Sequence, residues 1–151
     1  MGIFHLGTDD YTIEVRATEQ IRLFRGWDVH RLSLTFEVAA SDEHTVDAPF
    51  LVSGSLWATG LSGSDGWIGD LHPSQGPVSL QPFTTTFTLA ASVTKETLRG
   101  LEETRAGADL ALRAYLTLTG VPERGRWPSA SDNVSFRIPH ATWSDQVAQL
   151  D

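Results

Sequence analysis

The sequence predicts a mainly β protein folded as an antiparallel two-sheet β-sandwich of about seven or eight strands. Apolar and polar residues alternate with a period of two along most of the chain, which is typical of half-buried strands. Strands do not alternate regularly with full helices, which disfavours a doubly wound parallel sheet. The chain of 151 residues suits one domain spanning 1–151, and no linker divides it. A β-barrel is the alternative architecture.

The first 58 residues contain four segments with the pattern of a strand. A strand is expected over 11–16, and a second short extended piece follows over 21–25. The strongest alternation covers 29–38, and another strand covers 50–58. Gly54 lies inside this last segment, where a glycine indicates a bulge or a close approach between backbones.

The regular pattern stops over 60–82, a stretch that contains five Gly and three Pro. A structureless loop of this length is unusual in a compact domain. The pair Asp65-Gly66 suits a type I′ turn, so a small hairpin that carries Trp67 and Ile68 is expected here.

The second half of the chain adds strands and one crossover helix. A Thr-rich strand over 83–91 is followed by a helix near 94–106, which we expect to cross from one sheet to the other. The clearest strand of all covers 109–119, and the last strand covers 134–138.

A short helix is expected to close the chain. Thr142 is its expected cap, with Asp145 three residues later. Its apolar stripe consists of Trp143, Val147 and Leu150.

The apolar sides of the alternating segments define the expected core. Its members are Leu32, Leu34, Phe36, Val52, Phe87, Leu89, Leu112, Leu116 and Phe136.

Composition and charge exclude several classes of function. The net charge of −8 works against binding to polyanions, so nucleic acid is not an expected partner. No apolar run approaches the length of a membrane span, and the start of the chain lacks the regions of a signal peptide, so a soluble cytoplasmic protein is expected. The absence of Cys excludes thiolate chemistry. Arg outnumbers Lys ten to one, which indicates a GC-rich bacterial genome.

Catalytic serine chemistry is the weakest of the functional hypotheses. Ser62 or Ser64 is the candidate nucleophile, with His72 and a nearby Asp such as Asp65 or Asp70. The stretch fails as a nucleophile elbow, because Ser64 stands where the pattern needs Gly. The sequence therefore predicts no catalytic residues and no enzyme.

A metal or cofactor site is also not expected. No His has a second His three to five positions away, so there is no zincin-like pair. The acidic group Asp42, Glu43, His44 and Asp47 lacks the Gly and Glu positions of an EF-hand. We interpret it as a charged hairpin turn that discourages edge-to-edge pairing.

The strongest functional signal is the pairing of Arg with Trp in two Gly-containing loops. These loops are Arg25-Gly26-Trp27-Asp28 and the segment 124–128. Arg and Trp are both enriched at binding hot spots. The alternative is that each Trp tucks under its own turn, with the Arg lying over it. The predicted partner-binding residues are Arg124, Arg126, Trp127 and Trp67, with Trp127 as the anchor and the two Arg pairing with partner carboxylates.

These observations favour a non-enzymatic protein-interaction or assembly module that binds another protein or a copy of itself. An immunity or antitoxin-like protein is one form of this hypothesis, because a small acidic domain suits the blocking of a basic partner. The alternative is a lectin-like or small-ligand-binding protein that uses Trp57, Trp67 or Trp127 as a stacking platform.

Overall fold

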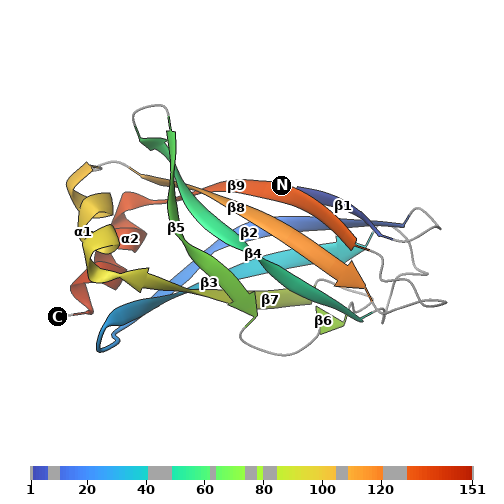
Figure 1. Cartoon of the computed structure of the whole chain (residues 1–151), viewed down its shortest axis with the longest axis horizontal. Helices are drawn as coiled ribbons and strands as arrows, with labels where there is room; N and C mark the ends of the chain where they lie inside the picture. The colour runs from blue at the N-terminus through green and yellow to red at the C-terminus, as the bar shows by residue number, and fades with distance from the viewer. Residues whose placement is uncertain are drawn as a thin grey trace.

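The strands of the protein form one antiparallel sheet, and two helices lie together at one end of it (Figure 1). The computed structural model describes residues 2–6, 11–40, 49–61, 64–73, 78–79, 85–104, 109–120 and 129–150. In chain order the elements are β1 (Gly2–Leu6), β2 (Tyr11–Phe24), β3 (Val29–Ala40), β4 (Pro49–Leu61), β5 (Ser64–Pro73), β6 (Val78–Ser79), β7 (Thr85–Thr94), α1 (Lys95–Thr104), β8 (Leu110–Gly120), β9 (Ser129–Ile138) and α2 (His140–Ala148).

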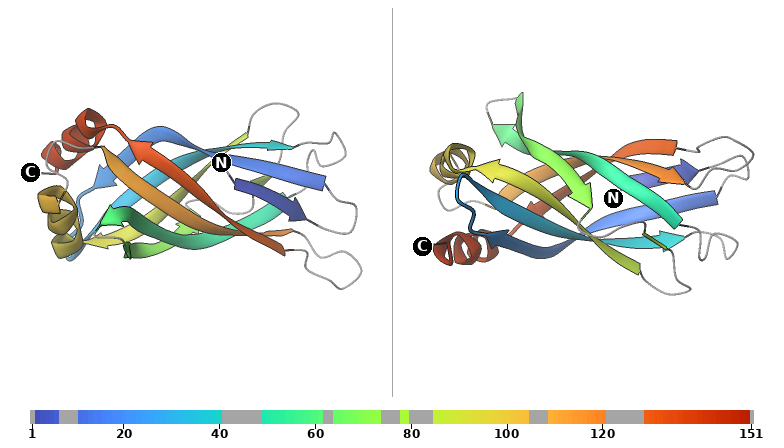
Figure 2. Two further views of the ribbon diagram at one scale, coloured as in Figure 1. Left: turned by 90° about the horizontal axis from the view of Figure 1, so that it is seen from above. Right: turned by 60° about the horizontal axis from the view of Figure 1, so that its bottom comes forward.

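The sheet curls until its two edges approach each other. The strand order is β1-β2-β3-β7-β5-β4-β8-β9, and the short β6 pairs with β4. The edge strands β1 and β9 run side by side (Figure 2), so the sheet is nearly closed into a barrel. The prediction of a two-sheet sandwich is therefore wrong, and the alternative of a barrel lies closer to the structure.

One short contact between strands makes the difference between a sandwich and this barrel. Strands β1, β2, β3 and β7 form one group of four, and β5, β4, β8 and β9 form another. Within the described ranges, the two groups are hydrogen-bonded only where β5 meets β7, through the pairs Leu71↔Ala91, His72↔Ala90 and Pro73↔Leu89. Without these pairs the same strands would form two separate sheets.

Strand β2 is longer than its pattern indicates. The two pieces expected over 11–16 and 21–25 are parts of one strand, with a register shift against β3 between Ala17 and Ile21. The hydroxyl of Thr18 donates a hydrogen bond of 2.8 Å to the Thr35 carbonyl oxygen inside this irregular stretch. A bulge interrupts the period-two pattern without ending the strand, which explains why one strand resembles two.

The expected hairpin over 60–82 exists, but its turn lies elsewhere. Leu61 pairs with Ser64, so the chain reverses between these two residues. Gly66 pairs with Ala58 inside the β4–β5 ladder, and the prediction of a turn at Asp65-Gly66 is wrong. Trp67 and Ile68 do lie on the hairpin, within β5.

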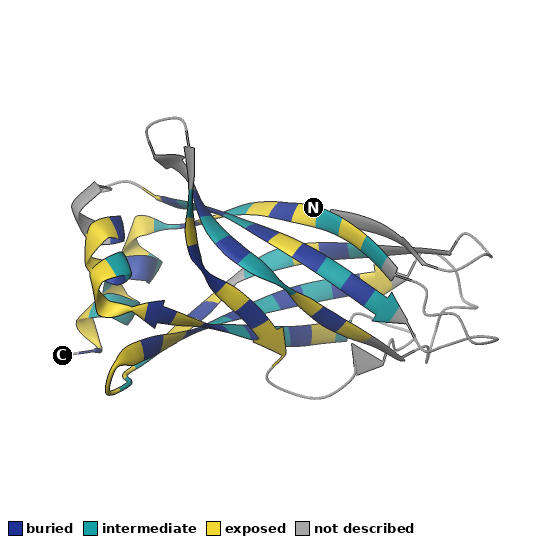
Figure 3. Ribbon diagram, in the orientation of Figure 1, coloured by how far each residue is buried: buried dark blue, intermediate teal, exposed yellow. Residues whose placement is uncertain are grey.

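The expected core is confirmed for eight of its nine residues. Buried and more exposed positions alternate along the strands (Figure 3), as the sequence pattern predicts. Phe136 is half-buried and contacts the core edge-on, with its ring centroid 6.2 Å from that of Phe36. Phe36 in turn stacks on Phe87 at 5.4 Å, so three aromatic rings from β3, β7 and β9 meet inside the barrel.

Helix α1 begins after Thr94, whose hydroxyl oxygen accepts a hydrogen bond of 3.1 Å from the Thr97 amide. This is the bond that an N-cap residue makes to the first turn of a helix. Leu98 and Leu101 are buried, as expected for the side of the helix that faces the barrel. The expected role as a crossover between two sheets is wrong, because β7 and β8, which the helix connects, belong to the same sheet.

Helix α2 begins one turn earlier than the sequence indicates. Its N-cap is Pro139, whose carbonyl oxygen accepts a 3.0 Å hydrogen bond from the Trp143 amide, so the prediction of Thr142 as the cap is wrong. The predicted apolar stripe is confirmed, with Trp143 and Leu150 buried and Val147 half-buried against the core. Neither of the described helices combines the length and apolar character needed to cross a membrane.

Gly100 offers a direct test of the α1 packing. A Cβ added at Gly100 would meet no atom within 4 Å, and the residue lies exposed in the middle of the helix. We therefore expect Gly100→Ala to raise the free energy of unfolding by about 0.5–1 kcal/mol, because alanine removes the entropic penalty of a helical glycine. Urea denaturation measures this change, and a destabilised variant would contradict the described exposure of Gly100.

Candidate functional site

The structure describes one of the four predicted partner-binding residues. Trp67 lies on β5 with 55% of its side chain exposed. Arg124, Arg126 and Trp127 lie outside the described residues. Their role in binding, like that of Trp67, stays a prediction.

Trp67 belongs to a group of aromatic residues on the outside of the barrel. It pairs across the β4–β5 ladder with Trp57, and Trp57 pairs across the β4–β8 ladder with Arg113. Residues that pair directly across strands share one face of a sheet. Tyr115, two residues along β8, is 41% exposed, and its ring meets the Trp57 ring edge-on at 6.2 Å. We call Trp57, Trp67, Tyr115 and Arg113 the aromatic face.

Hydrogen bonds hold three members of the aromatic face in place. The Trp57 indole donates to the Ser55 hydroxyl at 2.9 Å. The Arg113 guanidinium donates to the Tyr115 hydroxyl at 3.3 Å and to the Ser135 hydroxyl at 3.4 Å. These bonds reduce the number of side-chain conformations that would have to be lost when another molecule binds.

The aromatic face fits the hypothesis of a lectin-like stacking platform in one respect and not in another. Trp57 and Trp67 are brought together as the sequence hypothesis requires. The planes of Trp57 and Tyr115, however, meet at 85°, so these two rings do not form one flat surface.

A second feature is the turn between β2 and β3. Trp27 has 92% of its side chain exposed, so the alternative in which this Trp tucks under its own turn is wrong. Two hydrogen bonds fix the backbone of the turn instead. The Gly26 amide donates to Nδ1 of His30 at 3.2 Å, and the Lys95 amine donates to the Trp27 carbonyl oxygen at 2.9 Å.

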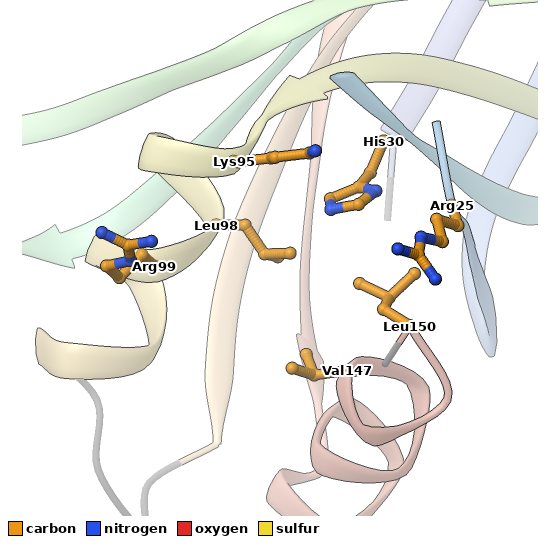
Figure 4. A pocket seen from close by; sticks show the side chains of 7 residues that line it. All are labelled: Arg25, His30, Lys95, Leu98, Arg99, Val147 and Leu150. Atoms are coloured by element: carbon orange, nitrogen blue, oxygen red, sulfur yellow. The ribbon is translucent and has the colours of Figure 1, made fainter. Parts of the chain in front are cut away.

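Next to this turn, a cleft of about 280 Å³ lies at the helical end of the barrel (Figure 4). Its basic side chains come from the turn, from β3 and from α1, and they are Arg25, His30, Lys95 and Arg99. Its apolar side chains come from α1 and from the α2 region, and they are Leu98, Val147 and Leu150. The cleft therefore combines a cationic rim with an apolar wall, and no described carboxylate lines it.

Sequence reasoning missed this cleft, although two signals pointed to it. His30 lies two residues before Leu32, on the apolar side of the 29–38 alternation, where a titratable side chain is unusual. Lys95 is the only lysine in the chain. Neither signal shows that β3, α1 and α2 meet at one place.

The hydrolase hypothesis gains no geometric support from the described residues. Asp70 and His72 are both exposed on β5, and no hydrogen bond to a described serine hydroxyl involves either of them. Ser62 lies outside the described residues.

The described ranges also contain no group of three or more His, Asp or Glu that could hold a metal ion. The acidic group at 42–47 lies outside them.

Comparison with known proteins does not place the chain. No protein family matches it, and no curated protein matches it.

Proposed function

We propose that this chain is a non-enzymatic protein-interaction module that binds a basic protein partner through the aromatic face. The observation that carries this proposal is the exposure of Trp67, at 55%, directly opposite Trp57 in the bulged part of the β4–β5 ladder. Exposed aromatic residues that lie together on a folded domain are a mark of interaction sites. Trp, Tyr and Arg are also the residue types most enriched at binding hot spots.

The arrangement of the aromatic face supports a tight contact. Trp57 and Tyr115 are each held by a hydrogen bond to a neighbouring side chain. A surface that is already ordered loses less conformational entropy when a partner docks. Trp67, the more exposed ring, is then placed to insert into a pocket of the partner.

Charge favours a basic partner. The chain carries a net charge of −8, which raises the encounter rate with positively charged proteins and slows self-association. Asp70 is exposed on β5, three residues from Trp67, and provides an acidic group beside the aromatic face.

Trp67→Ala tests the proposal. A partner captured from the producing cells is identified and purified, and its affinity for the chain is measured by calorimetry. We expect Trp67→Ala to weaken binding by about 2 kcal/mol or more, because the anchor of a hot spot is lost. The free energy of unfolding should change by less than about 1 kcal/mol, since the side chain is largely exposed.

Trp27→Ala is the matched control. Trp27 is 92% exposed in the β2–β3 turn, away from the aromatic face, so its loss should leave the affinity unchanged. Association with the partner should also slow as salt is added, because screening weakens the attraction between opposite charges. An acidic partner, equal binding by the Trp67→Ala variant, or a dimer of the chain that depends on Trp67 would each overturn the proposal.

A further inference from the structure

The cleft at the helical end of the barrel contains a buried polar group with an unused donor. His30 is only 8% exposed, and its Nδ1 accepts a hydrogen bond from the Gly26 amide. When the imidazole is neutral, an accepting Nδ1 leaves the proton on Nε2. No described residue bonds to Nε2, and this nitrogen points into the cleft on the side of Leu98 (Figure 4). A donor that faces the cleft and has no described partner is available to bond with a ligand there.

Positive charge gathers around the same point. The Arg25 guanidinium and the Lys95 amine both point toward the cleft from opposite sides, whereas the Arg99 guanidinium points to the far side of α1 (Figure 4). Arg25 makes no hydrogen bond or ion pair with any described residue. Lys95 uses one of its three donors on the Trp27 carbonyl oxygen, which leaves two for a ligand.

The charge of the cleft contrasts with the charge of the chain. The protein has 11 Lys and Arg against 19 Asp and Glu, yet among the described residues two Arg, one Lys and no acidic residue line this cleft. Unpaired cations and a donor that converge without a carboxylate form a site for an anion.

The opposite wall of the cleft is apolar. Leu98 comes from α1, and Val147 and Leu150 come from the α2 region, so side chains from the two helical regions form an apolar surface across the cleft from the cations. The volume of about 280 Å³ equals roughly nine water molecules at about 30 Å³ each. A ligand with one acidic head and a short apolar body would use both walls, whereas an inorganic anion would use only the rim.

We propose that this cleft binds a small organic anion, with a carboxylate or phosphate head and a short apolar body. The Nε2 donor of His30, the Arg25 guanidinium and the Lys95 amine hold the head. Leu98, Val147 and Leu150 cover the body. The site is separate from the aromatic face and does not depend on the protein-interaction function.

Calorimetric titration with matched six-carbon probes tests the chemistry of the ligand. Hexanoate and hexyl phosphate should each bind saturably, with a dissociation constant of about 1 mM or lower. Hexylamine and hexanol share the apolar body without the negative head, and they should not bind. Inorganic phosphate shares the head without the body, and it should bind at least about tenfold more weakly than hexyl phosphate. Binding of hexylamine or hexanol, or phosphate binding as tight as that of hexyl phosphate, would overturn the proposal.

Substitutions test the residues. Arg25→Gln and Lys95→Gln should each weaken hexanoate binding by about tenfold or more, because each removes one charged donor. Arg16→Gln removes the same charge from an exposed position on β2 that does not line the cleft, and it should leave the affinity unchanged. Equal effects of all three substitutions would show a nonspecific effect of charge and would overturn the proposal.

Histidine side-chain NMR provides a readout that does not depend on affinity. Bound hexanoate should shift the Nε2 resonance of His30 and leave those of His72 and His140 in place, because neither of these lines the cleft. An unshifted His30 at saturation would overturn the assignment of its donor. Trp67→Ala should leave hexanoate binding intact, so failure of the aromatic-face proposal and failure of this one can be told apart.

Discussion

Replacing Leu116 with alanine is expected to lower the free energy of unfolding by about 2–5 kcal/mol, the usual range for truncating a fully buried leucine. Leu116 lies on β8 with 1% of its surface exposed. Its strand is hydrogen-bonded on both sides, to β4 and to β9, so the surrounding backbone has little freedom to collapse into the space left by the side chain. The cost therefore includes both the lost burial and a residual cavity.

Chemical denaturation in urea measures this change, and Leu51→Ala is its control. Leu51 lies on the neighbouring strand β4 with 45% of its surface exposed, so the same truncation should cost less than about 1 kcal/mol there. A cost below about 1 kcal/mol at Leu116 would mean that this side chain is not part of the core.

Gly54→Ala is expected to destabilise the protein by about 3 kcal/mol or more, the upper range for inserting a methyl group into a packed site. A Cβ at Gly54 would lie 2.1 Å from the Tyr115 carbonyl oxygen and 3.0 Å from Cδ2 of Leu116. The first contact is with backbone, which cannot move aside as a flexible side chain can. The β4–β8 ladder would have to separate at this point, and the sequence prediction of a close approach at Gly54 is confirmed.

Gly100→Ala is the control for Gly54→Ala, because it makes the same substitution at a glycine with open space around it. The same substitution should stabilise α1 and destabilise the barrel, because only Gly54 meets a neighbouring backbone. A Gly54→Ala variant within about 1 kcal/mol of the parent would contradict the close approach of β4 and β8.

The double variant Gly54→Ala/Leu116→Ala should be less destabilised than the sum of the two single variants. Leu116 pairs directly with Gly54, and its Cδ2 atom is one of the atoms that a new Cβ would meet. Removing that atom relieves part of the clash, but the contact with the Tyr115 carbonyl oxygen persists. A double-mutant cycle therefore separates the side-chain part of the cost from the backbone part.

Local patterns predicted most of the strands, both helices and the core, but not β1 (Gly2–Leu6) or the short β6 (Val78–Ser79). Alternation over 29–38 and 109–119 placed Leu34, Phe36 and Leu116 inside, because a strand sends successive side chains to opposite faces whatever its partners are. The apolar stripe of α2 followed from helical spacing in the same way. Other predictions failed at the cap of α2 and at the turn after Leu61. At both places several neighbouring polar or glycine residues have similar local preferences for a cap or a turn.

The sites depended on long-range register. Trp57 and Trp67 are ten residues apart, and only the bulged pairing of β4 with β5 places them opposite each other. The cleft depends on tertiary structure even more strongly. Arg25, Lys95 and Val147 come from the β2–β3 turn, α1 and α2, which meet at one end of the barrel. No spacing in the sequence encodes that meeting.

The sequence by itself determined most of the strands, which side of each of those strands is buried, and that the protein is mainly β. Tertiary structure alone decided whether those strands form a sandwich or a nearly closed barrel, because both architectures bury one face of every strand and so produce the same alternation. The decision rests on Leu71, His72 and Pro73, which join β5 to β7. These residues lie in the Gly- and Pro-rich stretch where the alternation fails, so the pairing that joins the two groups of strands into one sheet left no periodic signal in the chain.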